Sequence, residues 1–365
     1  MQASDRRGGR RRGRGGSSKR HVRSAALVVA LLGAVARVQA APTDPFPTPP
    51  ALAPAVRFWV DVFTRYTNDQ VLVHDRFTPG AVFAVLRVTP GPDAGARIAR
   101  ELEAVANRLT LMRLFDPDVV RRAWLDTMTP VHPGDVTPTD RVHLQRGLRE
   151  AFADALAARD LYRPVVERAL EAEGLPLALA ALPLIESSYH PSAVSGAGAV
   201  GLWQLSRDTA RAYLRVEGDV DERRDPELAS RAAARHLHAL YDALGSWPLA
   251  VTAYNRGLAG VERARRALGT DDVGVLATRY WDDEAFGFAS RNYYGQFLAA
   301  LHVTRHRDRY FHEVPPRRMV EYRVRRGDTL FEVARRHGVS LGELCVTNGL
   351  KSADLQPGQR ILIRL

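Results

Sequence analysis

Apolar residues recur at helical spacing through most of the second half of the chain. Leu175–Ile185 is the strongest segment, because its eleven residues carry no charge and a segment that is apolar all round belongs in a core. Asp225-Pro226 predicts an N-cap and a first-position proline for the helix that follows. Further helices are predicted at Trp247–Asn255, Gly260–Leu268 and Phe286–Arg305. The pattern therefore predicts a mainly α domain over residues 166–313.

The first half of the chain mixes strand and helix signals. Gln70–Asp75 and Ala81–Val88 have strand character, and the Thr78-Pro79-Gly80 turn between them predicts a hairpin. Ala96–Leu114 and Leu148–Leu161 show helical spacing of apolar residues. We find no catalytic constellation in this region, and the prediction for residues 58–165 is an N-terminal α+β accessory domain without an assigned role.

A small module follows the helical region. Val314-Pro315-Pro316 interrupts the helical pattern, so residues 314–320 are predicted to be a linker. Within residues 321–365 an alternating strand comes first and a strand with Ile361 and Ile363 on one face comes last. Two capping boxes lie between them, at Thr329–Glu332 and Ser340–Glu343. The predicted order is β-α-α-β.

The N-terminus has the three parts of an export signal. A basic region is followed by the apolar run Ser24–Ala36 and by the small-residue site Val38-Gln39-Ala40. Residues 1–40 are therefore predicted to be a signal peptide that sends the protein to the periplasm or cell envelope, with an uncleaved membrane anchor as the alternative. Residues 41–57 are rich in Pro and Ala and are predicted to be a linker.

The charge of the chain is concentrated in this leader. The net charge is +11, and residues 1–23 hold nine Lys or Arg and one Asp, which leaves only +3 for the remainder. A nucleic-acid partner is therefore not supported for the folded part. The single cysteine, Cys345, excludes an internal disulfide framework, and the leader has no cysteine that could carry a lipid.

Glu186 is the candidate catalytic residue. It directly follows the uncharged Leu175–Ile185 segment, so packing should place its carboxyl in partly apolar surroundings and raise its pKa. A carboxylic acid that stays protonated near neutral pH can donate a proton to a glycosidic oxygen. A standard glycosidase also needs a second carboxylate, but no Asp or Glu lies between Glu186 and Asp208.

The segment after Glu186 is suited to a bulky, neutral ligand. Glycines at 196, 198 and 201 allow the backbone to approach a ligand closely, and Ser195 and Gln204 offer neutral hydrogen-bonding groups. Glu186-Ser-Ser-Tyr-His-Pro-Ser-Ala-Val-Ser-Gly-Ala-Gly-Ala-Val-Gly-Leu-Trp-Gln204 closely resembles the motif of the soluble lytic transglycosylase (SLT) family, and Ala253-Tyr-Asn-Arg-Gly257 resembles a second motif of that family.

The C-terminal module carries a resemblance of its own. Gly327-Asp-Thr-Leu330, Asn348 and Leu355-Gln-Pro-Gly358 resemble a LysM domain, a peptidoglycan-binding module. The order SLT then LysM is similar to that of the membrane-bound lytic murein transglycosylases of the D type. The resemblance covers about half of the chain, from roughly residue 165 onward, and implies a lysozyme-like helical fold.

The resemblance also implies a reaction. Family members cut the β-1,4 bond between N-acetylmuramic acid and N-acetylglucosamine without adding water, and leave a 1,6-anhydro end. By motif match Glu186 would be the acid and then the base, while Ser195, Gln204, Tyr254 and Asn255 would bind the sugar, and Tyr293 would lie near the glutamate. The reaction needs no cofactor. The implied partner is the peptidoglycan glycan strand, and a single LysM predicts modest affinity because avidity from repeats is missing.

Two other functions stay open at this stage. A goose-type lysozyme-like hydrolase would use the same fold and glutamate with water as the nucleophile. A peptidoglycan-binding scaffold would have an inactive SLT domain, and the LysM module and the unassigned N-terminal region are what suggest it. A metal site is not predicted, because His302 and His306 lack both a third ligand and the glutamate of a zincin motif.

Overall fold

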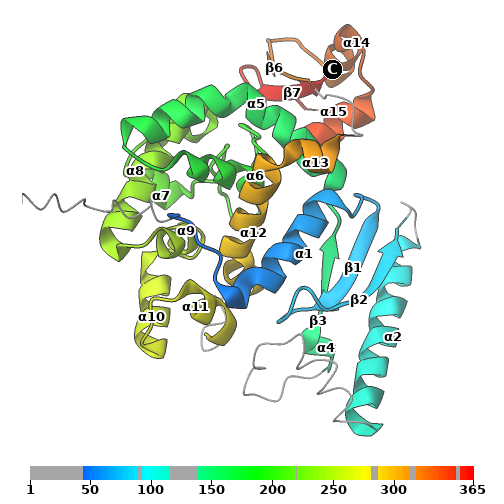
Figure 1. Ribbon diagram of the computed structural model, residues 1–365. Helices are drawn as coiled ribbons and strands as arrows, with labels where there is room; N and C mark the ends of the chain where they lie inside the picture. The colour runs from blue at the N-terminus through cyan, green and yellow to red at the C-terminus, as the bar shows by residue number, and fades with distance from the viewer. Residues whose placement is uncertain are drawn as a thin grey trace, which may run out of the picture. The chain divides into compact units, whose positions relative to one another are not determined.

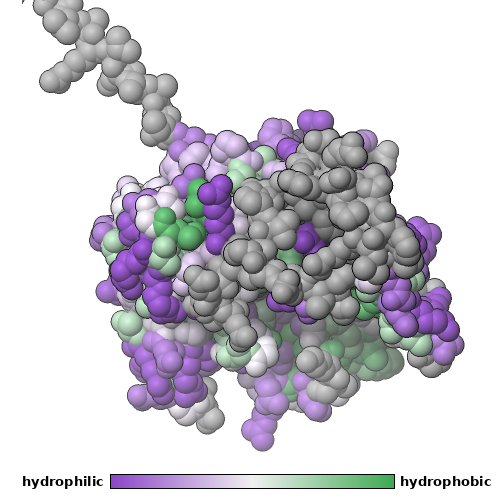
Figure 2. All heavy atoms as spheres, turned by 90° about the horizontal axis from the view of Figure 1, so that it is seen from below, coloured by the Kyte–Doolittle hydropathy of each residue, from purple (hydrophilic) through white to green (hydrophobic). Residues whose placement is uncertain are grey.

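The computed structural model describes residues 44–88, 93–115, 138–218, 220–280, 287–312, 318–350 and 354–365 (Figure 1). The predicted signal peptide, residues 1–40, lies outside the described residues. Among the residues described, no helix combines the length and the apolar character needed to cross a bilayer. Hydrophilic side chains cover much of the described surface in the view of Figure 2, with smaller hydrophobic patches between them.

The prediction of a linker at residues 41–57 is wrong for the part that the structure describes. A 3-10 turn, η1 (Pro50–Leu52), leads directly into α1 (Ala53–Thr64). Phe46 and Leu52 are 2% and 3% exposed, and Phe58 packs in the same core. The prolines are tolerated because they stand before the helix or in its first turn, where no backbone N–H is needed.

A three-stranded antiparallel sheet follows α1. Its order is β2 (Val82–Arg87), β1 (Gln70–Asp75) and β3 (Val142–Arg146), so the predicted hairpin is confirmed and β1 lies in the centre. Helix α2 (Ala94–Phe115) packs on this sheet, and the short helix α4 (Pro138–Arg141) precedes β3.

Most buried residues of the accessory region belong to the same core as the helical region, apart from a small cluster between α2 and the sheet, and the predicted boundary at residue 165 falls inside a helix. Helix α5 (Arg149–Ala172) runs through that boundary without a break, with Pro164 inside it. Helix α1 packs against α12 (Phe288–Arg305) and α5 packs against α8 (Pro226–Leu244), as Figure 1 shows. One hydrophobic core therefore joins the N-terminal helices to the helical domain.

The mainly α character predicted for residues 166–313 is confirmed. Its other elements are η2 (Leu177–Ala181), α6 (Leu182–Glu186), α7 (Arg207–Arg211), β4 (Val216–Glu217), β5 (Val220–Asp221), η3 (Glu222–Arg224), α9 (Trp247–Arg256), α10 (Leu258–Leu268), α11 (Val273–Arg279) and α13 (Arg307–Phe311). The predicted cap is also present, because the Asp225 carboxylate accepts hydrogen bonds from the backbone N–H groups of Glu227 and Leu228.

The C-terminal module has the predicted β-α-α-β order. Strands β6 (Met319–Arg323) and β7 (Arg360–Arg364) pair antiparallel around α14 (Leu330–His337) and α15 (Leu341–Asn348). Both capping boxes are formed, at Thr329–Glu332 and at Ser340–Glu343. Strand β6 begins within the predicted 314–320 linker, at Met319.

This module contacts the segment that follows α6. The Ser192 hydroxyl donates to the carbonyl oxygen of Arg360 at 2.6 Å, and His190 Nε2 donates to Asn348 Oδ1 at 2.8 Å. The Arg360 guanidinium pairs with Asp225 and Glu321, each at 2.9 Å. The end of the chain thus packs directly on the loop that carries the candidate site.

Candidate active site

Glu186 is the last residue of α6, and the elements before it explain its environment. Leu179, Leu182 and Leu184 are at most 3% exposed and anchor η2 and α6 in the core. Burial raises the pKa of the half-buried Glu186 carboxyl to about 7, against a hydrogen bond that lowers it. Near neutral pH this carboxyl is therefore divided between its protonated and ionised forms.

Tyr293 supplies the opposing hydrogen bond. It lies on α12, is 4% exposed, and donates its hydroxyl to Glu186 Oε1. Burial, followed by the nearby charge of Glu186, raises the pKa of Tyr293 well above its usual value, so it remains a neutral donor. The prediction that Tyr293 lies near Glu186 agrees with this contact, which spans 107 positions of sequence.

The backbone reverses immediately after Glu186. Ser188 and Tyr189 adopt left-handed φ values of 53° and 61°, which non-glycine residues adopt only where the surrounding structure demands it. The fully buried Tyr189 donates its hydroxyl to the carbonyl oxygen of Ala180 at 2.6 Å. The Ser187 hydroxyl donates to the carbonyl oxygen of Leu202 at 2.7 Å, which ties the start of the loop to its end.

Ser195 and Gln204 shape this loop from within. Ser195 Oγ accepts a hydrogen bond from the Ala199 N–H at 3.0 Å and closes a tight turn. Gln204 has a φ of 47°, and its side-chain nitrogen donates to the carbonyl oxygens of Ala193 and Gly201 at 3.3 and 3.0 Å. These side chains bond to their own segment, and their amide and hydroxyl groups are fixed by it.

Tyr254 and Asn255 come from the end of α9. The Tyr254 hydroxyl donates to the carbonyl oxygen of Trp203 at 2.7 Å, and its pKa is raised by burial and then by the charge of Glu186. Asn255 is exposed and accepts a hydrogen bond from the Ser290 hydroxyl at 3.0 Å, which links α9 to α12. Trp203 is fully buried and donates to Ser230, as expected for a packing residue.

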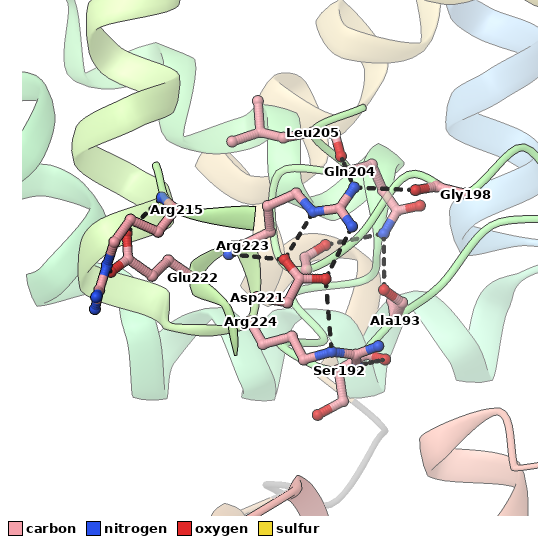
Figure 3. A network of polar contacts seen from close by, with 11 residues as sticks. Ser192, Ala193, Gly198, Gln204, Leu205, Arg215, Asp221, Glu222, Arg223 and Arg224 are labelled. Atoms are coloured by element: carbon pink, nitrogen blue, oxygen red, sulfur yellow. Dashed lines mark hydrogen bonds and ion pairs between the residues drawn. The ribbon is translucent and has the colours of Figure 1, made fainter. Parts of the chain in front are cut away.

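Two features of the site were missed by sequence reasoning. The first is a buried ion pair of Arg223 with Asp221, which also bonds to the loop that carries Ser195 and Gln204 (Figure 3). The second is a cavity of about 250 Å³ beside α6, whose walls include Trp59 from α1, Ser188 and Gln296. The ion pair is local, but the contacts of Arg223 to the loop and the walls of the cavity join segments that are distant in sequence, so the sequence gives no signal for them.

Two segments of the chain match known protein families. The family model for the transglycosylase SLT domain matches residues 164–273, and the model for the LysM domain matches residues 322–364. This chain carries an SLT domain followed by a LysM domain. Five of the six candidate residues lie inside the SLT match, whereas Tyr293 lies beyond its end.

The chain is also similar to curated proteins. Over 258 residues the chain is 26% identical to membrane-bound lytic murein transglycosylase D of Escherichia coli K12, which covers 64% of this chain and 56% of that protein. The chain thus spans only about half the length of this relative. It is also 37% identical over 100 residues to peptidoglycan transglycosylase gp16 of Escherichia phage T7, covering 26% of this chain and 8% of that protein.

A likeness to solved structures accompanies these matches. The 70 kDa soluble lytic transglycosylase SLT70 from Escherichia coli aligns with a TM-score of 0.34 and 23% identity. The aligned region covers 40% of this chain and 24% of that one.

Proposed function

We propose that this protein is an exported lytic transglycosylase that cleaves the β-1,4 bond between N-acetylmuramic acid and N-acetylglucosamine in peptidoglycan. The observation that carries the proposal is the Glu186 carboxyl, with a pKa of about 7 and a hydrogen bond from Tyr293, inside an SLT domain. The relatives named above are themselves transglycosylases by name, which supports the same reaction class.

In the proposed reaction Glu186 acts twice. Its protonated form donates to the glycosidic oxygen of the leaving sugar, and the carboxylate that results takes a proton from the C6 hydroxyl of the muramic acid residue. The C6 oxygen then bonds to the anomeric carbon and gives a 1,6-anhydro end. Because both reacting groups belong to one sugar, proximity favours the ring closure and no water is consumed.

The other candidate residues serve this step indirectly. Tyr293 orients the Glu186 carboxyl and stabilises its ionised form through the hydroxyl that it donates. Ser195, Gln204, Tyr254 and Asn255 form the neutral surroundings that bind the sugar and its N-acetyl group. The LysM domain binds the same polymer, and the leader directs the protein to the periplasm or cell envelope.

Product mass tests the proposal. The chain without residues 1–40 is incubated with purified murein sacculi, and the soluble muropeptides are weighed by mass spectrometry. We expect products one water lighter than the hydrolysed species at the muramic acid end, and none from Glu186→Gln. The exposed Glu171 on α5 gives a matched control, Glu171→Gln, which should keep full activity.

The alternatives give different results in the same experiment. Reducing ends would identify a lysozyme-like hydrolase with water as nucleophile. No release by the wild-type chain, with sacculus binding intact, would identify a binding scaffold.

A further inference from the structure

The buried guanidinium of Arg223 is not used by the reaction proposed above. Arg223 lies on η3 and is 4% exposed, whereas its neighbour Arg224 remains exposed. A buried charge is strongly unfavourable unless it is paired and hydrogen-bonded. Its partners therefore indicate why the fold retains it.

Asp221 provides the counter-charge. Its two carboxylate oxygens accept hydrogen bonds from Nε and Nη2 of Arg223, each at 2.8 Å, in the bidentate geometry that only arginine offers. Burial opposes ionisation of Asp221, but the hydrogen bonds and charge of Arg223 together outweigh it and lower the pKa of the carboxyl. The pair is thus charged at neutral pH.

The third guanidinium nitrogen of Arg223, Nη1, contacts the glycine-rich loop. Nη1 of Arg223 donates to the carbonyl oxygens of Gly198 and Leu205, both at 3.1 Å. Gly198 comes before Gln204 in the sequence and Leu205 comes directly after it, and Figure 3 shows the three residues around the Arg223 guanidinium. One side chain therefore joins both ends of the segment that carries Gln204, one of the proposed sugar-binding residues.

The backbone of Arg223 fixes the middle of the same loop. A Cβ atom on Gly201 would lie 2.0 Å from the Arg223 carbonyl oxygen, and Gly201 has a φ of 84°. The loop can approach this closely only because residue 201 is glycine. Arg223 thus contacts the loop at its start, middle and end.

We propose that Arg223, held by Asp221, is a positioning residue that sets the geometry of loop 198–205 for sugar recognition by the SLT domain. The proposal rests on the proposed function. Arg223 acts through the loop, because its side chain is buried and affects the ligand only through the backbone that it holds in place. Lysine keeps the charge but lacks the planar fork, so it cannot hold Asp221 and both carbonyls at once.

The experiment compares Arg223→Lys with Arg215→Lys. Arg215 is a matched control because its side chain is 78% exposed and pairs with Glu222 at 2.8 Å outside the loop. Hydrogen exchange is measured on the amides of residues 198–205 and, as a reference, on those of α8. Cleavage of soluble, uncross-linked glycan strands gives kcat and KM, and thermal unfolding gives Tm.

We expect Arg223→Lys to speed exchange in the loop but not in α8, and to lower kcat/KM by on the order of 10- to 100-fold. Arg215→Lys should change neither. A lower Tm with unchanged loop exchange and unchanged kcat/KM per folded molecule would show a merely structural role and overturn the proposal. If Arg223→Lys does not fold, Asp221→Asn takes its place, because it keeps one acceptor and the shape of the pair.

A separate measurement distinguishes this proposal from the proposed function. In a Glu186→Gln background, binding of the same glycan strands is compared with and without Arg223→Lys. Weaker binding supports the positioning role, whether or not the wild-type chain cleaves the strands, and unchanged binding contradicts it. Absence of anhydro products from wild type contradicts only the transglycosylase activity.

Discussion

The difference in stability between wild type and Glu186→Gln changes with pH in a way that reports the pKa of the Glu186 carboxyl. Between its ordinary value of 4.5 and its value of about 7 in the fold, the folded chain binds more protons than the unfolded chain. The contribution of Glu186 to the free energy of unfolding must then fall as pH rises through this window, and it must stay constant above the window. Glutamine has nearly the same shape, can accept the Tyr293 hydroxyl and never ionises.

The magnitude follows from the shift. Each pKa unit corresponds to about 1.36 kcal/mol, so an elevation from 4.5 to about 7 gives about 3.4 kcal/mol as an upper value. The carboxyl is half-buried and retains some contact with solvent, which screens part of the effect. We therefore expect the free energy of unfolding of Glu186→Gln, relative to wild type, to increase by about 2 kcal/mol between pH 5 and pH 8.

Urea unfolding at the two pH values measures this difference by linear extrapolation. All other titratable groups are the same in both proteins, so their contributions cancel in the comparison, and Glu171→Gln provides a matched Glu-to-Gln control at an exposed position. A constant offset for Glu186→Gln, within about 0.5 kcal/mol, would refute the reasoning that burial raises the pKa of Glu186. So would an offset that shrinks at high pH.

Further predictions concern neighbouring groups. Tyr293→Phe removes the hydrogen bond that lowers the pKa of Glu186, so the alkaline limb of the cleavage profile should move from near 7 to higher pH as kcat falls; an acid shift would contradict this. Burial lowers the pKa of His74 from 6.5 to about 4, so on acidification from near pH 7.5 to near pH 4 wild type should lose about 2 to 3 kcal/mol more than His74→Leu does, as measured by urea unfolding of both. Gly201→Ala places a Cβ 2.0 Å from a backbone oxygen at positive φ and should cost about 3 kcal/mol in thermal unfolding. Gly196→Ala, which meets open space, should cost less than half of that.

Local signals predicted local structure well. The Asp225 cap and the two capping boxes of the LysM domain depend on residues three positions apart, and all three are formed. The prediction of a linker at 41–57 was wrong for the opposite reason. A pattern of apolar positions shows that a face is buried but not against what, and here α1 buries its face against α12 and α5 buries its face against α8.

The residues of the candidate site likewise differ in whether local sequence or distant contacts reveal them. Glu186 and the direction of its pKa shift were predicted from the uncharged segment before it, and burial is the largest cause of that shift in the structure. Tyr293 was named only through family resemblance, since 107 positions separate it from Glu186. Arg223 had neither signal: in sequence it is one basic residue among charged neighbours, and only the fold shows that it is buried against the loop.

The pKa of Glu186 results from two opposing effects: burial raises it, and the hydrogen bond from Tyr293 lowers it. A carboxyl that must first give a proton and then take one works best when its pKa lies near the working pH. Full exposure would leave it near 4.5, where it is a poor acid, and burial without a donor would raise its pKa further and make the ionised form too costly to reach. Tyr293 sets the compromise, because its hydroxyl stabilises the carboxylate while its ring helps to exclude water. In the proposed reaction this pair allows one carboxyl to act as both acid and base, since desolvation and one neutral donor place both protonation states within reach at neutral pH.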